Sequence, residues 1–297
     1  MTKRQRKRRK SGQQAPARSS AQRSGAQQAS LQNFTIKGWA VTAQVLRMRR
    51  DVAAVLDLMG FFDWLGDENM RAIRRRLPRL ACESGCAYCC HVGATRPDLL
   101  PVEALRIVKY LEQDDDARRR VKARLETGDS GFPEDAVLPA PCLFLHQERC
   151  TIYPVRPLRC RAQNSPDAAL CEQNYRGRRA TMPLLSEPAL LYKSLQMGLR
   201  LGLQEVELGS APLQMTPAIR LARSASGIFD RWLGGEAVFE AVVYPEAADE
   251  AQLIARFMRQ NRVRLGVEQQ AMQRVISMCV NAPGTWARYT VDGRSRL

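Results

Sequence analysis

Eight of the nine cysteines in this chain lie within 90 residues, in two groups. The first group has the pattern C-x3-C-x2-C-C, and the second is spread over thirty residues. Two thiolates that are two or three residues apart can bind one metal ion from a single turn of backbone, and the other ligands must then come from elsewhere. The pattern therefore predicts that a metal joins the two groups. The predicted ligands are Cys82, Cys86, Cys89, Cys90, Cys142, Cys150, Cys160 and Cys171.

Eight thiols could supply two four-coordinate sites, or one site with spare thiols, and the spacing favours neither arrangement. The only two histidines of the chain, His91 and His146, lie beside the cysteines. We interpret them as bystanders or as hydrogen-bonding neighbours of the ligands, since the thiols already suffice. Four arginines among the second group are predicted to neutralise thiolate charge or to donate hydrogen bonds to sulfur: Arg149, Arg156, Arg159 and Arg161.

The alternatives for so many cysteines are a disulfide framework and a set of unligated core thiols. The chain begins with a basic run and has no apolar stretch of the kind found in a secretory signal. We therefore expect a cytoplasmic protein, and in that reducing compartment clustered thiols more often hold metal or do redox chemistry than form disulfides. Eight ordinary core cysteines in so short a stretch would be an unusual composition, so metal binding is favoured.

The formal charge of +16 is carried largely by one end of the chain. Residues 1–30 hold nine lysines and arginines and no acidic residue, and their low complexity predicts a disordered basic tail. Such a tail attracts phosphate without specificity, so we expect loose contact with polyanions. A specific nucleic-acid contact or a nuclear address is the alternative interpretation. No run of about 20 apolar residues is present, so no membrane span is expected.

The rest of the chain predicts a mostly α-helical fold, because apolar residues recur at helical spacing. The first helix should run from Trp39 to Met59 and stop at Gly60, and a second should run from Phe61 to Leu80. Strand signals are limited to one small hairpin, formed by residues 142–145 and 150–153. We expect four parts: a disordered basic tail (1–30), N-terminal helices (31–80), a loop-rich, metal-stapled cysteine-cluster domain (80–175) and a C-terminal helical region (183–297).

The C-terminal region should contain several helices. One of them is expected to begin at Thr216-Pro217 and to end at Gly234-Gly235, where two glycines follow the last apolar position. The ninth cysteine, Cys279, lies on the apolar face of the last predicted helix and far in sequence from the other eight. We interpret Cys279 as a buried core thiol rather than as a metal ligand.

The cysteine motifs carry a resemblance to a known family. The segment from Cys82 to Cys90, followed by Pro141-Cys142-Leu-Phe-Leu and then Cys150-Thr-Ile-Tyr-Pro-Val-Arg-Pro-Leu-Arg-Cys-Arg161, resembles the YkgJ-like cysteine-cluster family. The resemblance covers roughly residues 80–175 and implies a domain that chelates zinc or iron through a CxxCxxCC signature. One departure is that three residues, not two, separate Cys82 from Cys86.

Three functions are compatible with these features. The first is a metal-binding protein that chelates zinc or iron through its cysteine thiolates. The second is an iron–sulfur enzyme, because flagellin lysine methylases carry a similar cysteine cluster and this resemblance implies methyl transfer. The third is a nucleic-acid-associated factor that uses the basic tail. The chain has no Walker loop, no glycine-rich nucleotide loop after a strand and almost no candidates for a Ser-His-Asp triad, so the sequence leaves enzymatic activity open.

Overall fold

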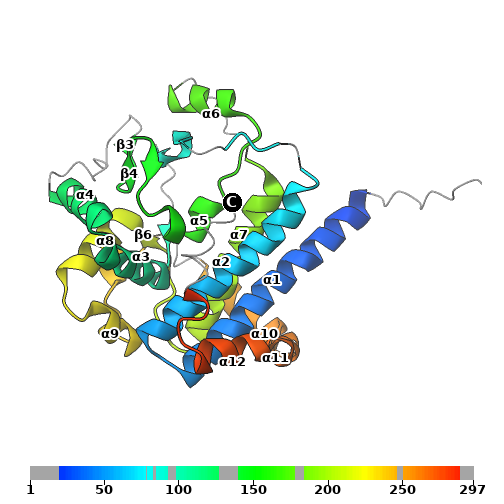
Figure 1. The fold of residues 1–297 in the computed structure, drawn as a ribbon. Helices are drawn as coiled ribbons and strands as arrows, with labels where there is room; N and C mark the ends of the chain where they lie inside the picture. Colours follow the sequence, from blue (N-terminus) through cyan, green and yellow to red (C-terminus); the bar gives the residue numbers. More distant parts are fainter. Residues whose placement is uncertain are drawn as a thin grey trace, which may run out of the picture.

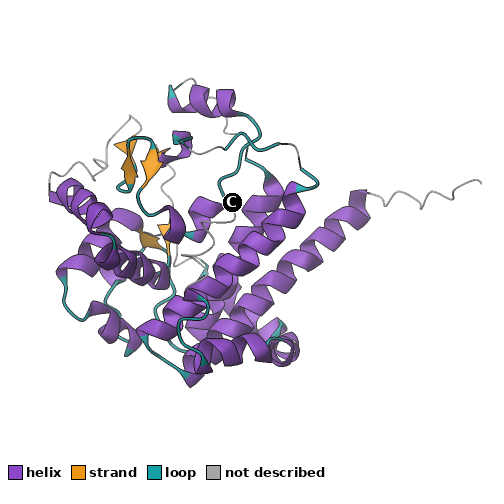
Figure 2. Ribbon diagram, in the orientation of Figure 1, coloured by secondary structure: helices purple, strands orange, loops and turns teal. Residues whose placement is uncertain are grey.

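The computed structural model describes residues 20–77, 79–82, 85–92, 98–126, 140–177, 184–245 and 250–287. Most of these residues are helical, which confirms the mostly α-helical fold (Figure 1, Figure 2). The first helices are α1 (Ser20–Met48), α2 (Val52–Arg74), α3 (Pro101–Gln113), α4 (Asp115–Glu126), α5 (Leu158–Arg161) and α6 (Ala168–Tyr175). They are followed by α7 (Ser186–Glu205), α8 (Met215–Ser224), α9 (Ile228–Leu233), α10 (Ala251–Gln260), α11 (Arg262–Ala271) and α12 (Gln273–Asn281). None of the helices in the described ranges is long and apolar enough to cross a lipid bilayer.

Three long helices, α1, α2 and α7, form the centre of the molecule (Figure 1). Helices α1 and α7 pack closely because glycines line their contact. A Cβ on Gly198 would lie 2.9 Å from the Cα of Gly38, and a Cβ on Gly202 would lie 2.2 Å from the Cβ of Thr42. The fully buried ring of Trp39 belongs to the same core. The close approach of these two helices sets the shape of the body on which the cysteine segment is placed.

The break between the first two helices lies at Asp51 and not at the predicted position, Gly60. The Asp51 carboxylate accepts the backbone N–H of Ala54 at 2.8 Å, so it caps the start of α2. Gly60 is inside α2, and a Cβ placed on it would lie 2.0 Å from the carbonyl oxygen of Trp286. The prediction was wrong because this glycine allows two segments of backbone to approach each other, which is a tertiary requirement.

A buried carboxylate holds the C-terminal segment at this contact. Asp57, which lies one turn before Gly60 on α2, is fully buried. Its two oxygens accept the backbone N–H groups of Gly284, Trp286 and Ala287 at 2.8 to 3.0 Å. Charged hydrogen bonds of this kind satisfy several donors at once, so Asp57 fixes residues 284–287 against α2.

Two further sequence predictions differ from the structure. The helix expected from Thr216 to Gly235 is divided into α8 and α9, because Gly227 adopts a left-handed conformation with φ of 66° between them. Of the predicted disordered tail, residues 1–19 lie outside the described residues. The backbone of residues 20–30 is the beginning of α1, in a stretch rich in the helix formers Ala and Gln.

Three pairs of very short antiparallel strands occur among the described residues (Figure 2). The predicted hairpin is present as β4 (Leu145–His146) and β5 (Arg149–Cys150). The other two pairs join segments far apart in sequence, which strand periodicity could not reveal. They are β1 (His91–Val92) with β3 (Ala140–Pro141), and β2 (Asp98–Leu99) with β6 (Leu213–Gln214). Short 3₁₀ helices also occur: η1 (Tyr88–Cys90), η2 (Tyr153–Val155) and η3 (Glu240–Val242).

The contact at Gly60 predicts a contrast between two glycines inside helices. Gly60→Ala should lower the free energy of unfolding by about 3 kcal/mol, because the methyl group would collide with the Trp286 carbonyl. Gly266→Ala in α11 is the matched control, since no atom lies within 4 Å of its added Cβ. It should raise stability by about 0.5 to 1 kcal/mol through helix propensity. Urea unfolding measures both changes, and equal effects would contradict the close contact.

Candidate metal centre

Backbone pairing places the two cysteine groups next to each other. Strand β1 directly follows the Cys89-Cys90 doublet, and strand β3 directly precedes Cys142. In this ladder His91 is paired with Pro141, and the Cys142 N–H donates to the carbonyl of Cys90 at 2.7 Å. The 51 residues between Cys90 and Cys142 thereby form a closed loop, and the first and second groups meet at these two cysteines.

The second group is positioned by the hairpin and by the short helix α5. The Cys142 carbonyl accepts the N–H of Leu145, and Cys150 lies opposite Leu145 in the β4–β5 pair. The two turn residues of this hairpin, Gln147 and Glu148, both have positive φ values, 47° and 57°. That conformation is typical of a tight two-residue turn and is unfavourable for residues other than glycine, asparagine and aspartate. The turn therefore returns the chain sharply and brings Cys150 back toward Cys142.

The remaining cysteines meet through the segment before α6. The backbone N–H of Ser165 donates to the Cys82 sulfur at 3.2 Å, and the N–H of Ala81 donates to the Ser165 carbonyl at 2.9 Å. Two residues further on, Asp167 caps α6 through the N–H of Leu170 at 2.9 Å. Helix α6 carries Cys171, which is buried, and it packs against η1 of the first group.

Backbone N–H groups point at the sulfur atoms in a repeated local pattern. Three cysteines accept a hydrogen bond from the residue two positions later: Cys86 from Tyr88, Cys142 from Phe144, and Cys150 from Ile152. Burial raises the pKa of all these thiols, and each of these bonds offsets part of that rise, as does the bond from Ser165 to Cys82. Donors fixed on sulfur in this way stabilise a thiolate, which is the form that binds metal.

The thiols also influence one another electrostatically across both groups. Cys89 is the common neighbour: its charge raises the pKa of Cys82 and Cys86 in the first group. It also raises the pKa of Cys142, Cys150 and Cys160 in the second group. Mutual repulsion of thiolates is the condition that a divalent cation relieves.

Burial keeps these thiols protonated in the absence of a cation. It raises the pKa of Cys142 to about 12 and that of Cys160 well above the ordinary value. The pKa of Cys89 is raised first by a hydrogen bond with the side chain of Cys90 and then by burial. Neutral buried thiols are poor nucleophiles. All nine cysteines are free, and within the described ranges no three His, Cys, Asp or Glu side chains converge closely enough to hold an ion.

Of the four arginines predicted to act on the thiols, Arg156 does so most broadly. Its charge lowers the pKa of Cys82, Cys89, Cys150 and Cys160. Its guanidinium carbon lies 4.4 Å from the ring centre of Tyr153, and its Nε is buried and finds no acceptor among the described residues. A buried donor without an acceptor, set among thiols, fits a site whose sulfur atoms become thiolates when metal binds.

The other three arginines serve different purposes. Arg149 is exposed at the hairpin, and Arg159 forms an ion pair with Asp98 at 2.7 Å. Arg161 turns into the helical body, where its guanidinium lies 3.0 Å from the Asp63 carboxylate. Arg106 contacts the same carboxylate, and Arg161 donates further to the Pro154 carbonyl at 2.9 Å. Because all of these groups are buried, the network fixes the turn before Cys160 to α2.

Two residues that the sequence did not single out also position the cysteine segment. Arg124 in α4 donates from one nitrogen to the carbonyls of Cys142 and Leu145, at 2.7 Å each. Glu103 in α3 is buried and uses both carboxylate oxygens. One accepts the N–H of Leu100 and the other the N–H of Leu158, each at 2.7 Å. Glu103 thus caps both α3 and α5, the helix that contains Cys160. Because Glu103 is over fifty residues from α5 in sequence, no local pattern could predict this cap.

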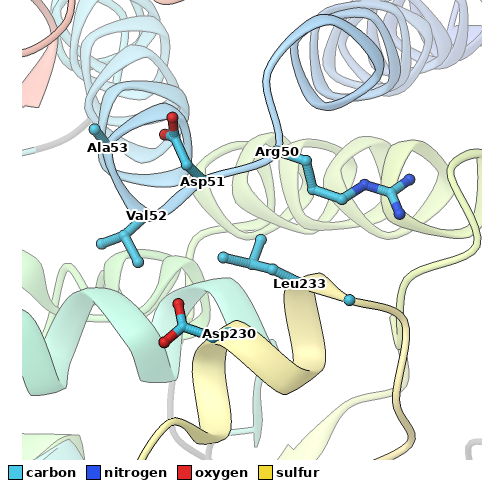
Figure 3. A pocket seen from close by; sticks show the side chains of 7 residues that line it. Arg50, Asp51, Val52, Ala53, Asp230 and Leu233 are labelled. Atoms are coloured by element: carbon cyan, nitrogen blue, oxygen red, sulfur yellow. The ribbon is translucent and has the colours of Figure 1, made fainter.

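The remaining residues make other contacts. A ring nitrogen of His91 is 3.4 Å from the Glu148 carboxylate, and the ring packs against Tyr175. Cys279 is fully buried in the hydrophobic core, which confirms its interpretation as a core thiol. A cleft of about 570 Å³ lies between the start of α2 and α9, with Asp51 and Asp230 on opposite sides of it (Figure 3). None of the residues that line this cleft is a cysteine.

The fold and the site together define a helical protein with a thiol-rich segment suited to a transition metal. Residues 81–179 match the CxxCxxCC family, whose description is "Putative zinc- or iron-chelating domain". The match spans about a third of the chain and agrees with the zinc- or iron-chelating CxxCxxCC signature that the sequence resembles. Neither the curated proteins nor the solved structures contain a match to the chain.

The buried position of Glu103 predicts a pH dependence of stability. Burial raises the pKa of Glu103 from 4.5 to about 7 in the folded protein. The folded state therefore holds a proton that the unfolded state releases between pH 4.5 and pH 7, so the contribution of Glu103 to stability is greatest below pH 4.5 and is lost as the pH rises to 7. The loss should be about 3 kcal/mol.

The measurement compares urea unfolding of the parent chain and Glu103→Gln at several pH values in this range. The stability of the parent relative to Glu103→Gln should fall by that amount as the pH rises. Titration of the cysteines is the same in both chains and cancels in the comparison. Glu112→Gln is the control, because Glu112 is half-exposed and pairs with Lys109. Parallel curves for the parent and Glu103→Gln would show that this carboxyl does not titrate in the range.

Proposed function

We propose that this protein chelates zinc or iron through thiolates drawn from both cysteine groups. The ligands proposed are the same eight cysteines that the sequence indicates, from Cys82 to Cys171. The observation that supports the proposal is the backbone bond between Cys142 and Cys90, since it brings the two cysteine groups next to each other. The family of residues 81–179 is described in terms of the same two metals.

Metal binding would complete an arrangement that is only partly assembled without it. The thiols are close enough to repel one another as thiolates, yet they do not converge on a point. A cation would draw them inward, and the sulfur-directed N–H groups would favour that change. A structural metal of this kind contributes on the order of 10 kcal/mol to folding, so we expect loading to order the cysteine segment.

Several finer points belong to the same proposal. The iron form would be either mononuclear or an iron–sulfur cluster, both of which use thiolate ligands. Nine free thiols suit a reducing compartment, so we propose a cytoplasmic location. Residues 1–30, with nine basic and no acidic side chains, would contact polyanions loosely.

The test of metal binding is elemental analysis with an absorption spectrum on chain purified anaerobically. We expect stoichiometric zinc or iron, with visible absorption if the metal is an iron–sulfur cluster. Cys90→Ser and Cys160→Ser should each lose most of the metal, because each removes one thiolate from a different group. Cys279→Ala is the matched control and should keep its full metal content, since this thiol lies in the core. Parent chain without zinc and iron would falsify the proposal.

The role given to Arg156 can be tested separately. Arg156→Met removes the buried Nε–H and the positive charge but keeps much of the side-chain volume. Metal affinity should fall by about 10- to 100-fold, as it does when a group that hydrogen-bonds a ligand is lost. Competition with a chromophoric chelator measures the change. Arg149→Met, at an exposed arginine of the same segment, should leave the affinity unchanged; an equal loss in both variants would assign the effect to net charge alone.

A further inference from the structure

Three of the eight clustered cysteines are held against the body of the protein. Cys142 and Cys150 pack against the hydrophobic core. Cys160 lies on α5, whose first residue, Leu158, is fully buried in the same core. We call Cys142, Cys150 and Cys160 the inner cysteines, because contacts with the core fix the backbone that carries them.

Helix α6 lies at the edge of the molecule and is attached at both ends to the first cysteine group (Figure 1). Just before the helix, the N–H of Ser165 donates to the Cys82 sulfur at 3.2 Å. At the end of the helix, the centre of the Tyr175 ring lies 5.9 Å from that of Tyr88 and 4.7 Å from that of His91. These contacts fix α6 against η1.

The cysteine that α6 carries is thereby grouped with the first two cysteines of the chain. Cys171 is only 6% exposed, yet it is not a member of the hydrophobic core that the described residues form. Cys82 is exposed and Cys86 is half-buried. We call Cys82, Cys86 and Cys171 the outer cysteines, because they lie between α6 and the first group at the surface of the molecule.

The electrostatic influence of the thiols on one another follows the same division. Beyond burial, which is the largest cause, the pKa of Cys86 is raised by the other two outer cysteines, and that of Cys160 by the other two inner cysteines. Cys89 raises the pKa of both. The doublet is tied to the inner set, since Cys89 hydrogen-bonds the Cys90 side chain and the Cys90 carbonyl accepts the Cys142 N–H.

We propose that the eight thiols form two metal sites of different kinds, a closed inner site and an open outer site. The inner cysteines with the Cys89-Cys90 doublet supply enough thiolates to surround one ion completely, which is typical of a structural metal. The outer cysteines supply only three ligands, so the fourth position of their ion is left to solvent. Each thiol releases its proton to solvent as the ion binds.

The two sites differ in what they do with their metal. An ion with an open position at the surface exchanges with ligands in solution, whereas an ion enclosed by thiolates holds the fold together. The outer ion is therefore metal that the protein takes up and gives away, and the inner ion remains bound. This inference rests on the chelation proposed above and adds to it the number of ions and the exchange of one of them.

The test is the binding and release of zinc by the full chain. Metal-free chain is loaded with Zn²⁺ under anaerobic conditions, and an excess of a chromophoric chelator is then added. We expect about two zinc ions per chain, one released in a fast phase and the other in a separate, slower phase. A single ion per chain, or two ions released together in one phase, would overturn the division into two sites.

Conservative variants assign the two phases. Cys171→Ser and Cys86→Ser should each lose the fast phase and about half of the zinc, and keep the slow phase and the circular dichroism of the parent. Cys160→Ser should lose most of the zinc, because the inner ion orders the doublet and η1, on which α6 packs. Cys279→Ala is the control and should keep both phases, since this thiol lies in the core.

The outcomes separate this inference from the chelation on which it rests. If Cys171→Ser and Cys86→Ser both keep the fast phase, the outer site is wrong while chelation by the other thiols stands. If these two variants lose all of their zinc although they stay folded, the eight thiols form one site and not two. A parent chain that binds no zinc contradicts the chelation itself and this inference with it.

Discussion

The hydrogen bond from Cys142 to the Cys90 carbonyl is the interaction on which the site depends. Neither cysteine group alone offers enough thiols with the freedom to surround a cation, because neighbouring residues on one turn cannot occupy all corners of a tetrahedron. The pairing of β1 with β3 removes that restriction by closing a long loop. In the proposed function a metal would take ligands from both segments, and the entropy of closing the loop has already been met by the fold.

The helical body acts on this segment through buried charges. Glu103, Arg124 and Arg161 each lie on a helix and each bind backbone groups of the cysteine segment. Apolar side chains of the segment, among them Phe144, Ile152 and Leu158, pack into the hydrophobic core, and these directional bonds fix its backbone in addition. The result is a cysteine segment whose backbone is held in place by side chains of α3, α4 and α5.

The two ends of the molecule carry different chemistry. The cysteines and their hydrogen-bond donors occupy one end, and the basic, partly apolar surface of α11 occupies the other (Figure 1). The close contact between α1 and α7 forms the body between them.

The sequence determined the metal-binding character, the mostly helical fold and the hairpin, since thiol spacing and apolar periodicity are local properties. It also indicated correctly that Cys279 belongs to the core. It placed the helix break at Gly60 instead of Asp51, because the sequence does not distinguish a glycine that ends a helix from one that allows a neighbouring carbonyl to approach. Only the tertiary structure decided that Cys90 lies beside Cys142 and that Glu103 caps α5. It also decided that Arg156, rather than Arg159 or Arg161, has the main influence of these arginines on the pKa of the thiols. Each of these depends on contacts between residues far apart in the chain, and such contacts leave no periodic trace in a single sequence.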